Sequence, residues 1–412
     1  MLSPYRVLDL TNERGLLCGQ ILGDLGADVI KVEPPGGSPA RRIGPFLADN
    51  PHPDRSLFWW AYNRNKRSIT LDLESADGRD VFHRLLDGAH FVIESDDPGY
   101  LAARGLGYRD LSVRNPALVY VSITPFGQNG PKAGYAATDL TLMASCGVMI
   151  QTGDDGRPPL RLGVPQAWLH GCADGAVGAL IANHEHVRSG IGQHVDVSVQ
   201  QSAALATQFG IVSAAIGADT WHRISGGLKV GPLDVPLVWR AKDGYVALSV
   251  LFGPSIGPFS ARLMRYLYDE GGCDAALRDK DWIGYGDLLF SGKEPVENYA
   301  AITRLVAEFV AARTKADLFK AATERNLLLA PITTIDEVMA SPQFAAREYF
   351  REVEHPELAG KFRYPGPFAK FGAAPIKYRY RPPTVGEHNR EIYAELGLSP
   401  SRIAELERKG II

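Results

Sequence analysis

Basic side chains gather at three places between residues 41 and 104 of this 412-residue chain. The members of these clusters are Arg41, Arg42, Arg64, Lys66, Arg67 and Arg104. Guanidinium and ammonium groups form charge-assisted hydrogen bonds with phosphate oxygens, so each cluster is a candidate for binding an anionic ligand. Each cluster alone is also consistent with solvated loop charge. Three clusters in one region of the chain favour an anionic ligand.

Other chemical patterns in the chain are weak by themselves. The segment 225–231 (SGGLKVG) is typical of an interdomain hinge and, less often, of an active-site flap. His184 and His186 would face different sides of a helix, which argues against a shared metal ion. The four cysteines form no C-x-x-C pair, which disfavours both a zinc site and a disulfide framework. No G-x-S-x-G motif is present.

The elements that would position the basic clusters alternate between strand and helix. Strands are predicted at residues 6–10, 27–33, 68–73, 91–94 and 118–123, and helices at 15–25 and 78–86. This alternation is typical of an α/β fold with a parallel, doubly wound sheet, where ligands bind beyond the carboxyl ends of the strands. The loop after the first strand lacks G-x-G-x-x-G, which disfavours NAD as the ligand.

The second half of the chain indicates a further, smaller domain. Helices are predicted at residues 138–147 and 168–186, a strand at 194–199, and then a small-residue helix to about 217. The second of these helices is rich in Ala and Gly, so neighbouring elements can pack closely against it. A strand pair is predicted around Gly244, with helices near 258–270, 300–325 and 335–340. The predicted domains are residues 1–222, the first part of a large domain; 223–328, a small inserted domain; and 329–412, a return segment that completes the large domain.

Composition and charge exclude several classes of function. The formal net charge is −3, so there is no global basic field for nucleic acid or for an anionic membrane. The first residues do not resemble a signal peptide, and no run of 18 apolar residues could span a bilayer. Well-separated cysteines suit a reducing compartment. We expect a cytoplasmic protein.

Taken in order, these stretches resemble the class III CoA-transferases, the CaiB/BaiF-type family that includes formyl-CoA and carnitine CoA-transferases. The stretches that carry the resemblance are RVLDL (6–10), GADVIKVE (26–33), PGG (35–37), NRNKRS (63–68), VIE (92–94), YVSITPFGQNG (120–130) and SGIGQHVDVS (189–198). Each motif alone is modestly specific, but their order and spacing together are highly specific. The resemblance is strong over residues 5–210 and looser beyond.

The resemblance implies a Rossmann-like large domain built from both chain ends, a small inserted α+β domain, and two chains interlocked as rings. Coenzyme A would be a thioester substrate lying across the large domain, with no permanently bound cofactor and no metal. The implied CoA contacts are Arg14, Leu71, Leu73, Ser95 and Arg104. Ser95 stands where many relatives have Asn, and Pro34 where some have a phosphate-binding Arg, for which Arg41 or Arg42 could substitute. Gly226 and Gly227 match the loop that covers the acyl site.

Family members use an Asp carboxylate that attacks the acyl-CoA thioester and forms a mixed anhydride. After the approach Gly163-Val164-Pro165-Gln166-Ala167, this chain has Trp168 at the matching position. An indole cannot serve as this nucleophile. The resemblance therefore favours a non-catalytic subunit of a heteromeric, benzylsuccinate-type CoA-transferase, paired with a paralogue that retains the Asp.

Two alternatives to this subunit hypothesis remain open. A displaced carboxylate could act instead, with Asp174, about 240° around the helix from Trp168, as the leading substitute and His170 as another. Asp139 is also nearby, but the family Asp at that position is structural. The CoA site could otherwise serve assembly or sensing; a racemase is a weaker option because it needs the missing Asp. Succinyl-CoA is the implied donor, and aromatic side chains, Trp168 among them, suggest an aromatic acceptor.

Overall fold

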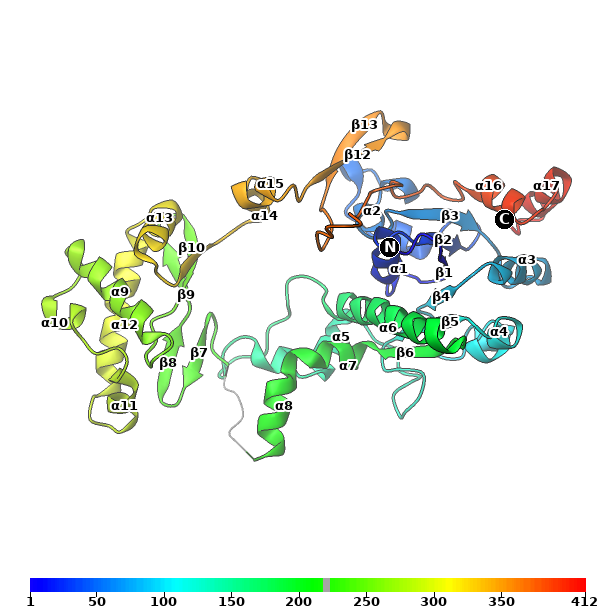
Figure 1. The fold of residues 1–412 in the computed structure, drawn as a ribbon. Helices are drawn as coiled ribbons and strands as arrows, with labels where there is room; N and C mark the ends of the chain where they lie inside the picture. The colour runs from blue at the N-terminus through cyan, green and yellow to red at the C-terminus, as the bar shows by residue number, and fades with distance from the viewer. Residues whose placement is uncertain (218–222) are drawn as a thin grey trace. The chain divides into compact units, whose positions relative to one another are not determined.

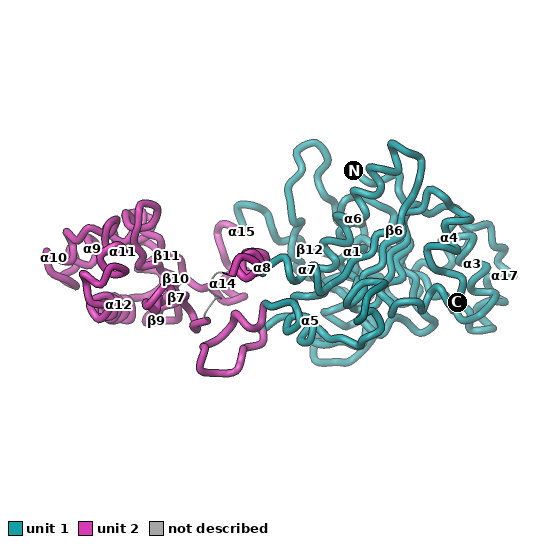
Figure 2. The backbone as a smooth tube through the Cα atoms, turned by 90° about the horizontal axis from the view of Figure 1, so that it is seen from below, with its two compact units in different colours: residues 1–147, 162–207, 345–412 teal, residues 148–161, 208–344 magenta. Residues whose placement is uncertain are grey.

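The computed structural model describes residues 1–217 and 223–412, which form two compact units. Unit 1 comprises residues 1–147, 162–207 and 345–412, and unit 2 comprises residues 148–161 and 208–344 (Figure 2). Unit 1 thus combines the two ends of the chain. The predicted linker at 221–231 begins outside the described residues. The domain boundaries placed at residues 222 and 328 stay a prediction.

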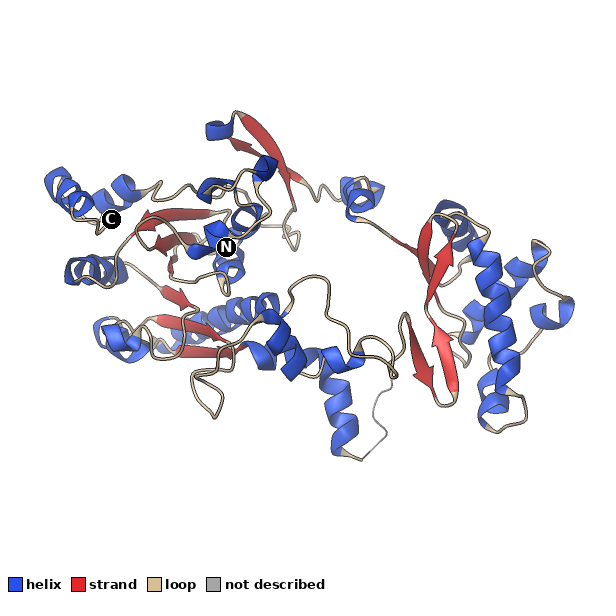
Figure 3. Cartoon of the chain, turned by 180° about the vertical axis from the view of Figure 1, so that it is seen from behind, coloured by secondary structure: helices blue, strands red, loops and turns tan. Residues whose placement is uncertain are grey.

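Unit 1 is built on a six-stranded, all-parallel sheet (Figure 3). Its spatial order is β3 (Lys66–Thr70), β2 (Asp28–Glu33), β1 (Arg6–Asp9), β4 (Phe91–Glu94), β5 (Val119–Thr124) and β6 (His194–Ser198). The predicted parallel α/β sheet is confirmed. Because the strand order reverses between β1 and β4, the loops after these two strands diverge, and ligands of such sheets bind in the crevice between them.

One face of this sheet is covered by α1 (Leu16–Asp24) and α6 (Ala167–Ser189), as the ribbon in Figure 1 shows. Glycines in α6 let the helix approach the sheet closely. A Cβ atom added at Gly175 would lie 2.9 Å from Ile123 Cδ1, and one at Gly178 only 2.6 Å from Val195 Cγ1. The close packing predicted from the small residues of this helix is confirmed.

The opposite face of the sheet carries a core formed with helices from both ends of the chain. These helices are α3 (Ala76–Asp87), α4 (Tyr108–Arg114), α16 (Asn389–Glu395) and α17 (Pro400–Arg408). The C-terminal helices are held at β3, where the Thr70 N–H donates to Asn389 Oδ1 at 2.9 Å and the His388 N–H donates to the Ser68 carbonyl at 2.9 Å. Unit 1 is completed by α2 (Leu57–Tyr62), α5 (Asp139–Ser145), α7 (Val199–Ala204) and the hairpin of β12 (Arg351–His355) and β13 (Gly360–Tyr364).

Unit 2 has its own core, formed between a three-stranded antiparallel sheet and several helices. The sheet runs β11 (Leu329–Ile332), β10 (Gly244–Leu248), β9 (Val238–Ala241), beside a separate hairpin of β7 (Gly227–Val230) and β8 (Leu233–Pro236). The helices are α8 (Gln208–Ala215), α9 (Gly257–Asp269), α10 (Ala275–Arg278), α11 (Tyr285–Phe290), α12 (Val296–Ala311), α13 (Lys315–Arg325) and α14 (Ile335–Met339), with α15 (Pro342–Ala346) at the boundary to unit 1.

Three predicted elements differ from the structure. The third strand begins at Lys66 rather than at residue 68, because its charged residues are buried and paired. The helix predicted to reach residue 217 is interrupted at residues 205–207, between α7 and α8. The helix predicted at 300–325 is two helices, since Thr314 caps a new one by accepting from the Asp317 N–H. None of the described helices is long and apolar enough to cross a membrane.

Candidate functional site

The first turn of α6 carries the position at which the resemblance places the family's nucleophile. Asp139, at the start of α5, fixes this turn: its Oδ1 accepts from the Gln166 N–H at 2.7 Å and from the Ala167 N–H at 2.8 Å. A carboxylate is favoured there because it accepts hydrogen bonds from the free N–H groups of the first turn and lies at the positive end of the helix dipole. Asp139 is therefore committed to holding the helix, as predicted.

Trp168 is half-buried in this first turn of α6. The Arg14 guanidinium lies 5.6 Å from the centre of the indole ring, and its Nη1 donates to Asp97 Oδ1 at 2.8 Å. The indole nitrogen can only donate a hydrogen bond, so Trp168 offers neither a nucleophile nor a base. The charged group beside the indole is the Arg14 guanidinium, whose positive charge is balanced by the Asp97 carboxylate.

The two substitutes considered for the nucleophile lie elsewhere on α6. Asp174 is half-buried six residues further on, about 9 Å along the helix axis from Trp168. His170 is exposed. Neither side chain is brought against Arg14 by any contact in the described part of the chain.

A groove of about 280 Å³ lies at the carboxyl ends of β1 to β4, in the crevice of the sheet. Its lining includes Leu71 and Leu73, two of the residues implied to contact CoA. Ser95 is fully buried beside it, where its Oγ accepts from the Asn12 N–H and donates to Asn12 Oδ1, both at 2.9 Å. Arg14 follows Asn12 in the same loop. The structure thus gathers these implied contacts around one crevice.

Arg104 lies at the rim of this groove and is held by two of the groove's own lining residues. Its Nε donates to Glu74 Oε1 at 2.7 Å, and its guanidinium lies 3.7 Å from the ring centre of Tyr100. Glu74 is exposed, and exposed ion pairs contribute little free energy. A phosphate could therefore take the place of Glu74 on Arg104.

Two charged residues of the groove escaped the sequence-based predictions. Lys31 lines it from β2 and is 1% exposed, with its Nζ 3.2 Å from Asp9 Oδ1. Asp96 lines it from the loop after β4, and burial raises the pKa of its carboxyl although Lys31 and Arg14 oppose that shift. The available signal was a lysine between the apolar residues Ile30 and Val32 of a predicted parallel strand, where a buried charge needs a partner.

Arg41 does not lie at the groove. It is 1% exposed, and its guanidinium donates to both carboxylate oxygens of Glu33 at 2.7 and 2.8 Å, to Asp54 Oδ1 at 2.9 Å and to the Pro383 carbonyl at 3.0 Å. The ring of Trp59 stacks against it, 3.8 Å away. A phosphate would have to break this buried network to reach Arg41. Arg42, the other proposed substitute, is exposed and has no ion-pair partner among the described residues.

The cluster formed by Arg64, Lys66 and Arg67 is also structural. Lys66 is fully buried, with its Nζ 2.8 Å from Asp9 Oδ2, and Arg64 and Arg67 form ion pairs with acidic side chains of Asp24 and Asp28. Burial would raise the pKa of Asp9, but the neighbouring Lys31 and Lys66 ammonium groups lower it below its usual range. Lys66 and Arg67 begin β3, and only Arg64 of this cluster lies in the turn before the strand, so the cluster is not loop charge as a whole.

Gly226 and Gly227 lie in unit 2, where the predicted glycine loop forms the start of the β7–β8 hairpin. Gly226 has a φ of 67°, and its carbonyl accepts from the Leu237 and Val238 N–H groups at 2.8 and 2.7 Å. A Cβ at Gly227 would lie 2.4 Å from the Val235 carbonyl oxygen. Both glycines are needed by the hairpin itself. Within the described residues, no cluster of three or more His, Cys, Asp or Glu side chains could hold a metal ion.

Comparison with known proteins gives one family over nearly the whole chain. The profile of CoA-transferase family III matches residues 2–389. The chain is 35% identical over 411 residues to the succinyl-CoA:(R)-benzylsuccinate CoA-transferase subunit BbsE of Thauera aromatica, covering 100% of this chain and 98% of that protein. It is 30% identical over 418 residues to the succinyl-CoA–D-citramalate CoA-transferase of Chloroflexus aurantiacus, with 100% and 98% covered.

A solved structure shows the same relationship. The crystal structure of a CaiB/BaiF family protein from Brucella suis matches with a TM-score of 0.80 and 29% identity, over 96% of this chain and 99% of that one. The parallel sheet and the crevice at its carboxyl edge agree with a CoA-binding fold of this type. The chain belongs to CoA-transferase family III, the CaiB/BaiF-type CoA-transferases.

Proposed function

We propose that this chain is the non-nucleophilic subunit of a heteromeric CoA-transferase, active with a paralogous chain that carries an aspartate where this one has Trp168. The observation that carries the proposal is the half-buried indole in the first turn of α6, beside Arg14. The carboxylate that pairs with Arg14 is that of Asp97, on the loop after β4, and the considered substitute Asp174 makes no contact with Arg14 in the described part of the chain. The similarity to a protein named as a subunit supports it. The chain contributes a CoA-type fold and depends on its partner for the covalent step.

The chemistry would run on the partner's aspartate. Its carboxylate oxygen bonds to the thioester carbonyl carbon, the C–S bond breaks, and CoA leaves as a thiolate with the electron pair. The product is a mixed anhydride, whose reactivity is close to that of a thioester, so the exchange stays reversible. The thiolate then returns to the carbonyl carbon of the incoming acid, which yields the new acyl-CoA and frees the aspartate.

Exposed apolar side chains on helices of this chain support the proposed second subunit. In unit 1, Val177 and Ile181 of α6 are 53% and 64% exposed. In unit 2, α8 has no buried residue in the described chain, and Ile211 and Val212 are 56% and 61% exposed. Exposed apolar side chains grouped on helices mark protein interfaces. The interlocked arrangement of the family would cover both surfaces with the paralogous chain.

The substrate classes follow from the relatives. Several are named for succinyl-CoA as the donor, and the benzylsuccinate enzyme is named for an acid that carries a benzyl group. We propose succinyl-CoA as the donor and an aromatic carboxylic acid as the acceptor.

The test compares three preparations: this chain alone, an Asp-bearing paralogue from the same organism, and the two purified together. With succinyl-CoA and benzylsuccinate, we expect CoA exchange from the pair, and from the pair only. Borohydride reduction followed by peptide mapping should place the activated carbonyl on the paralogue's aspartate. Full exchange by the solitary chain would overturn the proposal, and CoA binding without exchange in any combination would indicate an assembly or sensing module.

Asp174 gives a separate prediction. If the covalent step lies on the partner, Asp174→Ala in the reconstituted pair should change kcat by less than about twofold, the range of surface substitutions that touch no reacting atom. The measurement is steady-state CoA exchange, with Asp80→Ala on the exposed side of α3 as the matched control. A loss of activity and of the borohydride adduct specific to Asp174→Ala would assign the nucleophile to this chain.

A further inference from the structure

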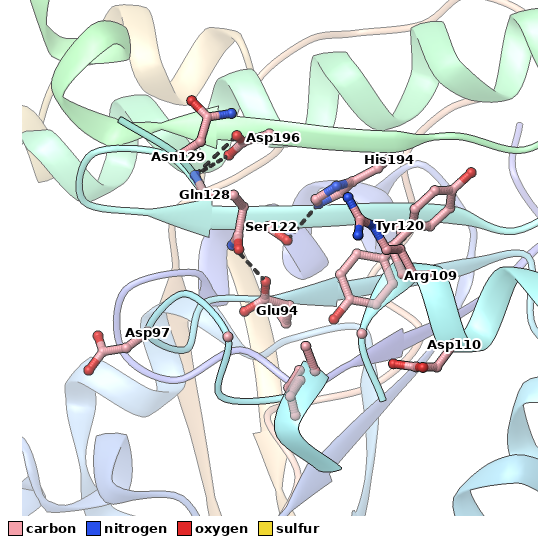
Figure 4. A pocket seen from close by; sticks show the side chains of 15 residues that line it. Glu94, Asp97, Arg109, Asp110, Tyr120, Ser122, Gln128, Asn129, His194 and Asp196 are labelled. Carbon is pink, nitrogen blue, oxygen red and sulfur yellow. Dashed lines mark hydrogen bonds between the residues drawn. The ribbon is translucent and has the colours of Figure 1, made fainter. Parts of the chain in front are cut away.

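A second cavity, of about 580 Å³, lies in unit 1 (Figure 4). Its walls include Tyr120 and Ser122 of β5 and His194 of β6. Successive residues of a strand point to opposite faces, and α6 packs against the alternate positions Ile123 and Val195. The cavity therefore lies on the sheet face opposite α6. Its volume falls within the range of small-molecule sites, about 300–1,000 Å³.

Glu94, the last residue of β4, forms part of the floor and is 4% exposed. One carboxyl oxygen, Oε2, accepts from the Asp96 N–H at 2.8 Å. The other, Oε1, faces the Gln128 amide at 3.5 Å, as the close-up shows, beyond the usual N–H···O range of about 2.7–3.2 Å. Within the described chain no lysine or arginine pairs with this carboxyl. The Ser122 hydroxyl also forms a hydrogen bond with this carboxyl. Because each carboxylate oxygen can accept two hydrogen bonds, Glu94 keeps the capacity to accept from a ligand in the cavity.

The charge around the cavity is unbalanced. Asp97, Asp110 and Asp196 line it together with Glu94, and Arg109 is the cation in the lining. Burial, with the nearby Asp96 and Asp196 carboxylates, raises the pKa of Glu94 to about 8, although the Ser122 hydroxyl and the Asp96 N–H lower it. An anionic ligand such as a CoA phosphate would be repelled here.

Aromatic rings complete the lining. The Tyr108 ring stacks on His194 with the ring centres 5.4 Å apart, and Tyr120 meets His194 edge-on at 5.5 Å. Rings with negative faces beside carboxylates form the surroundings that an organic cation prefers. Burial lowers the pKa of His194, so this ring stays neutral and does not supply the missing positive charge.

We propose that this cavity is a second ligand site that takes an organic cation, an ammonium or guanidinium group, which donates to Glu94 Oε1 and lies against the Tyr108–His194–Tyr120 wall. The cation belongs either to a free amine or to a basic side chain of the partner subunit. Two lining residues connect this cavity with the candidate transferase site: Asp97 pairs with Arg14, and Leu101 also lines the groove at the carboxyl ends of β1 to β4. The ligand proposed here is nevertheless a cation, the opposite charge to that of a CoA phosphate.

The test is calorimetric titration of the full chain, without its paralogue, with ethylguanidinium and spermidine at low salt. We expect saturable binding in the wild type, with the Kd raised about tenfold or more in Glu94→Gln and in Asp196→Asn. Asp80→Asn, which removes an exposed charge from α3, should change the Kd by less than about twofold. Glutamine keeps the size of Glu94, and circular dichroism confirms that each variant is folded.

Proton release provides a second readout. Glu94 is mostly protonated at pH 7, so a bound cation should expel close to one proton, which titrations in buffers of different ionisation enthalpy measure. The groups that face it, Asp96, Tyr120 and Asp196, are all unchanged in Glu94→Gln and in the control Asp80→Asn, which are the variants compared here. Absence of saturable binding, or equal affinity in wild type and Glu94→Gln, would overturn the proposal.

Probe binding to the assembled pair distinguishes the two sources of the cation, a free amine and a side chain of the paralogue. If a free amine is the ligand, the assembled enzyme binds the same probes. If a partner side chain fills the cavity, assembly abolishes probe binding, and Glu94→Gln weakens the pair by about tenfold in Kd. Because the first titration uses the solitary chain, its result does not depend on whether the transferase proposal holds.

Discussion

Trp168→Asp should give this chain a nucleophile of its own. The new carboxylate would occupy the first turn of α6, where the helix dipole and the Arg14 guanidinium, now 5.6 Å from the indole centre, both favour the ionised form. Asp139 already fixes the start of the helix through the Gln166 and Ala167 N–H groups. With succinyl-CoA, the variant should release CoA thiol and form a borohydride-reducible adduct at residue 168.

The expected gain is large because losing the nucleophile of a covalent enzyme costs about 10⁶-fold in rate. Recovering even a small share should raise thiol release about 100-fold or more above the wild-type chain. Trp168→Asn is the matched control, since it has nearly the same volume as Asp but cannot attack a thioester. Equal thiol release from the Asp and Asn variants would mean that this chain does not present residue 168 to the thioester.

The local sequence pattern was sufficient to predict much of the secondary structure of unit 1. Phe91–Glu94 could be predicted to the residue because a β-prone run lies between turn signals. In unit 2, the split of the predicted helix at 300–325 was missed, although a Thr followed three residues later by an Asp is a helix-start signal and Thr314 caps α13. Both features depend on neighbours within a few residues, which a single sequence shows directly.

The charged residues could not be placed in the same way. The partners of Arg67 include Asp28, 39 residues away, and Arg41 donates to a carbonyl of Pro383, 342 residues away. A basic residue before a predicted strand looks like solvated loop charge until such partners are known. The same limit hid Glu94, whose environment is assembled from β4, β5 and β6. The motif order identified the family, but only the fold could separate structural arginines from those beside the groove.

Glu94→Gln should remove a strong dependence of stability on pH. Glu94 has an ordinary pKa of 4.5, raised to about 8 in the folded chain because it is buried. Between these values the folded state keeps the proton and the unfolded chain releases it. The free energy of unfolding therefore falls as pH rises, by about 1.4 kcal/mol per unit, and the preference is lost above pH 8. Between pH 4.5 and about pH 8, the total decrease in the free energy of unfolding is about 5 kcal/mol.

Glutamine cannot ionise, so this decline should be absent from the variant. Urea unfolding at pH 5, 7 and 9 (about two units apart, to bracket the window) measures it, with Asp80→Asn as a control that keeps Glu94. Relative to wild type, Glu94→Gln should gain stability steadily toward alkaline pH, while Asp80→Asn runs parallel to wild type. Parallel curves for all three proteins would show that the pKa of Glu94 is not raised in the folded chain. A cation bound permanently to Glu94 in the purified chain would lower this pKa and so produce parallel curves.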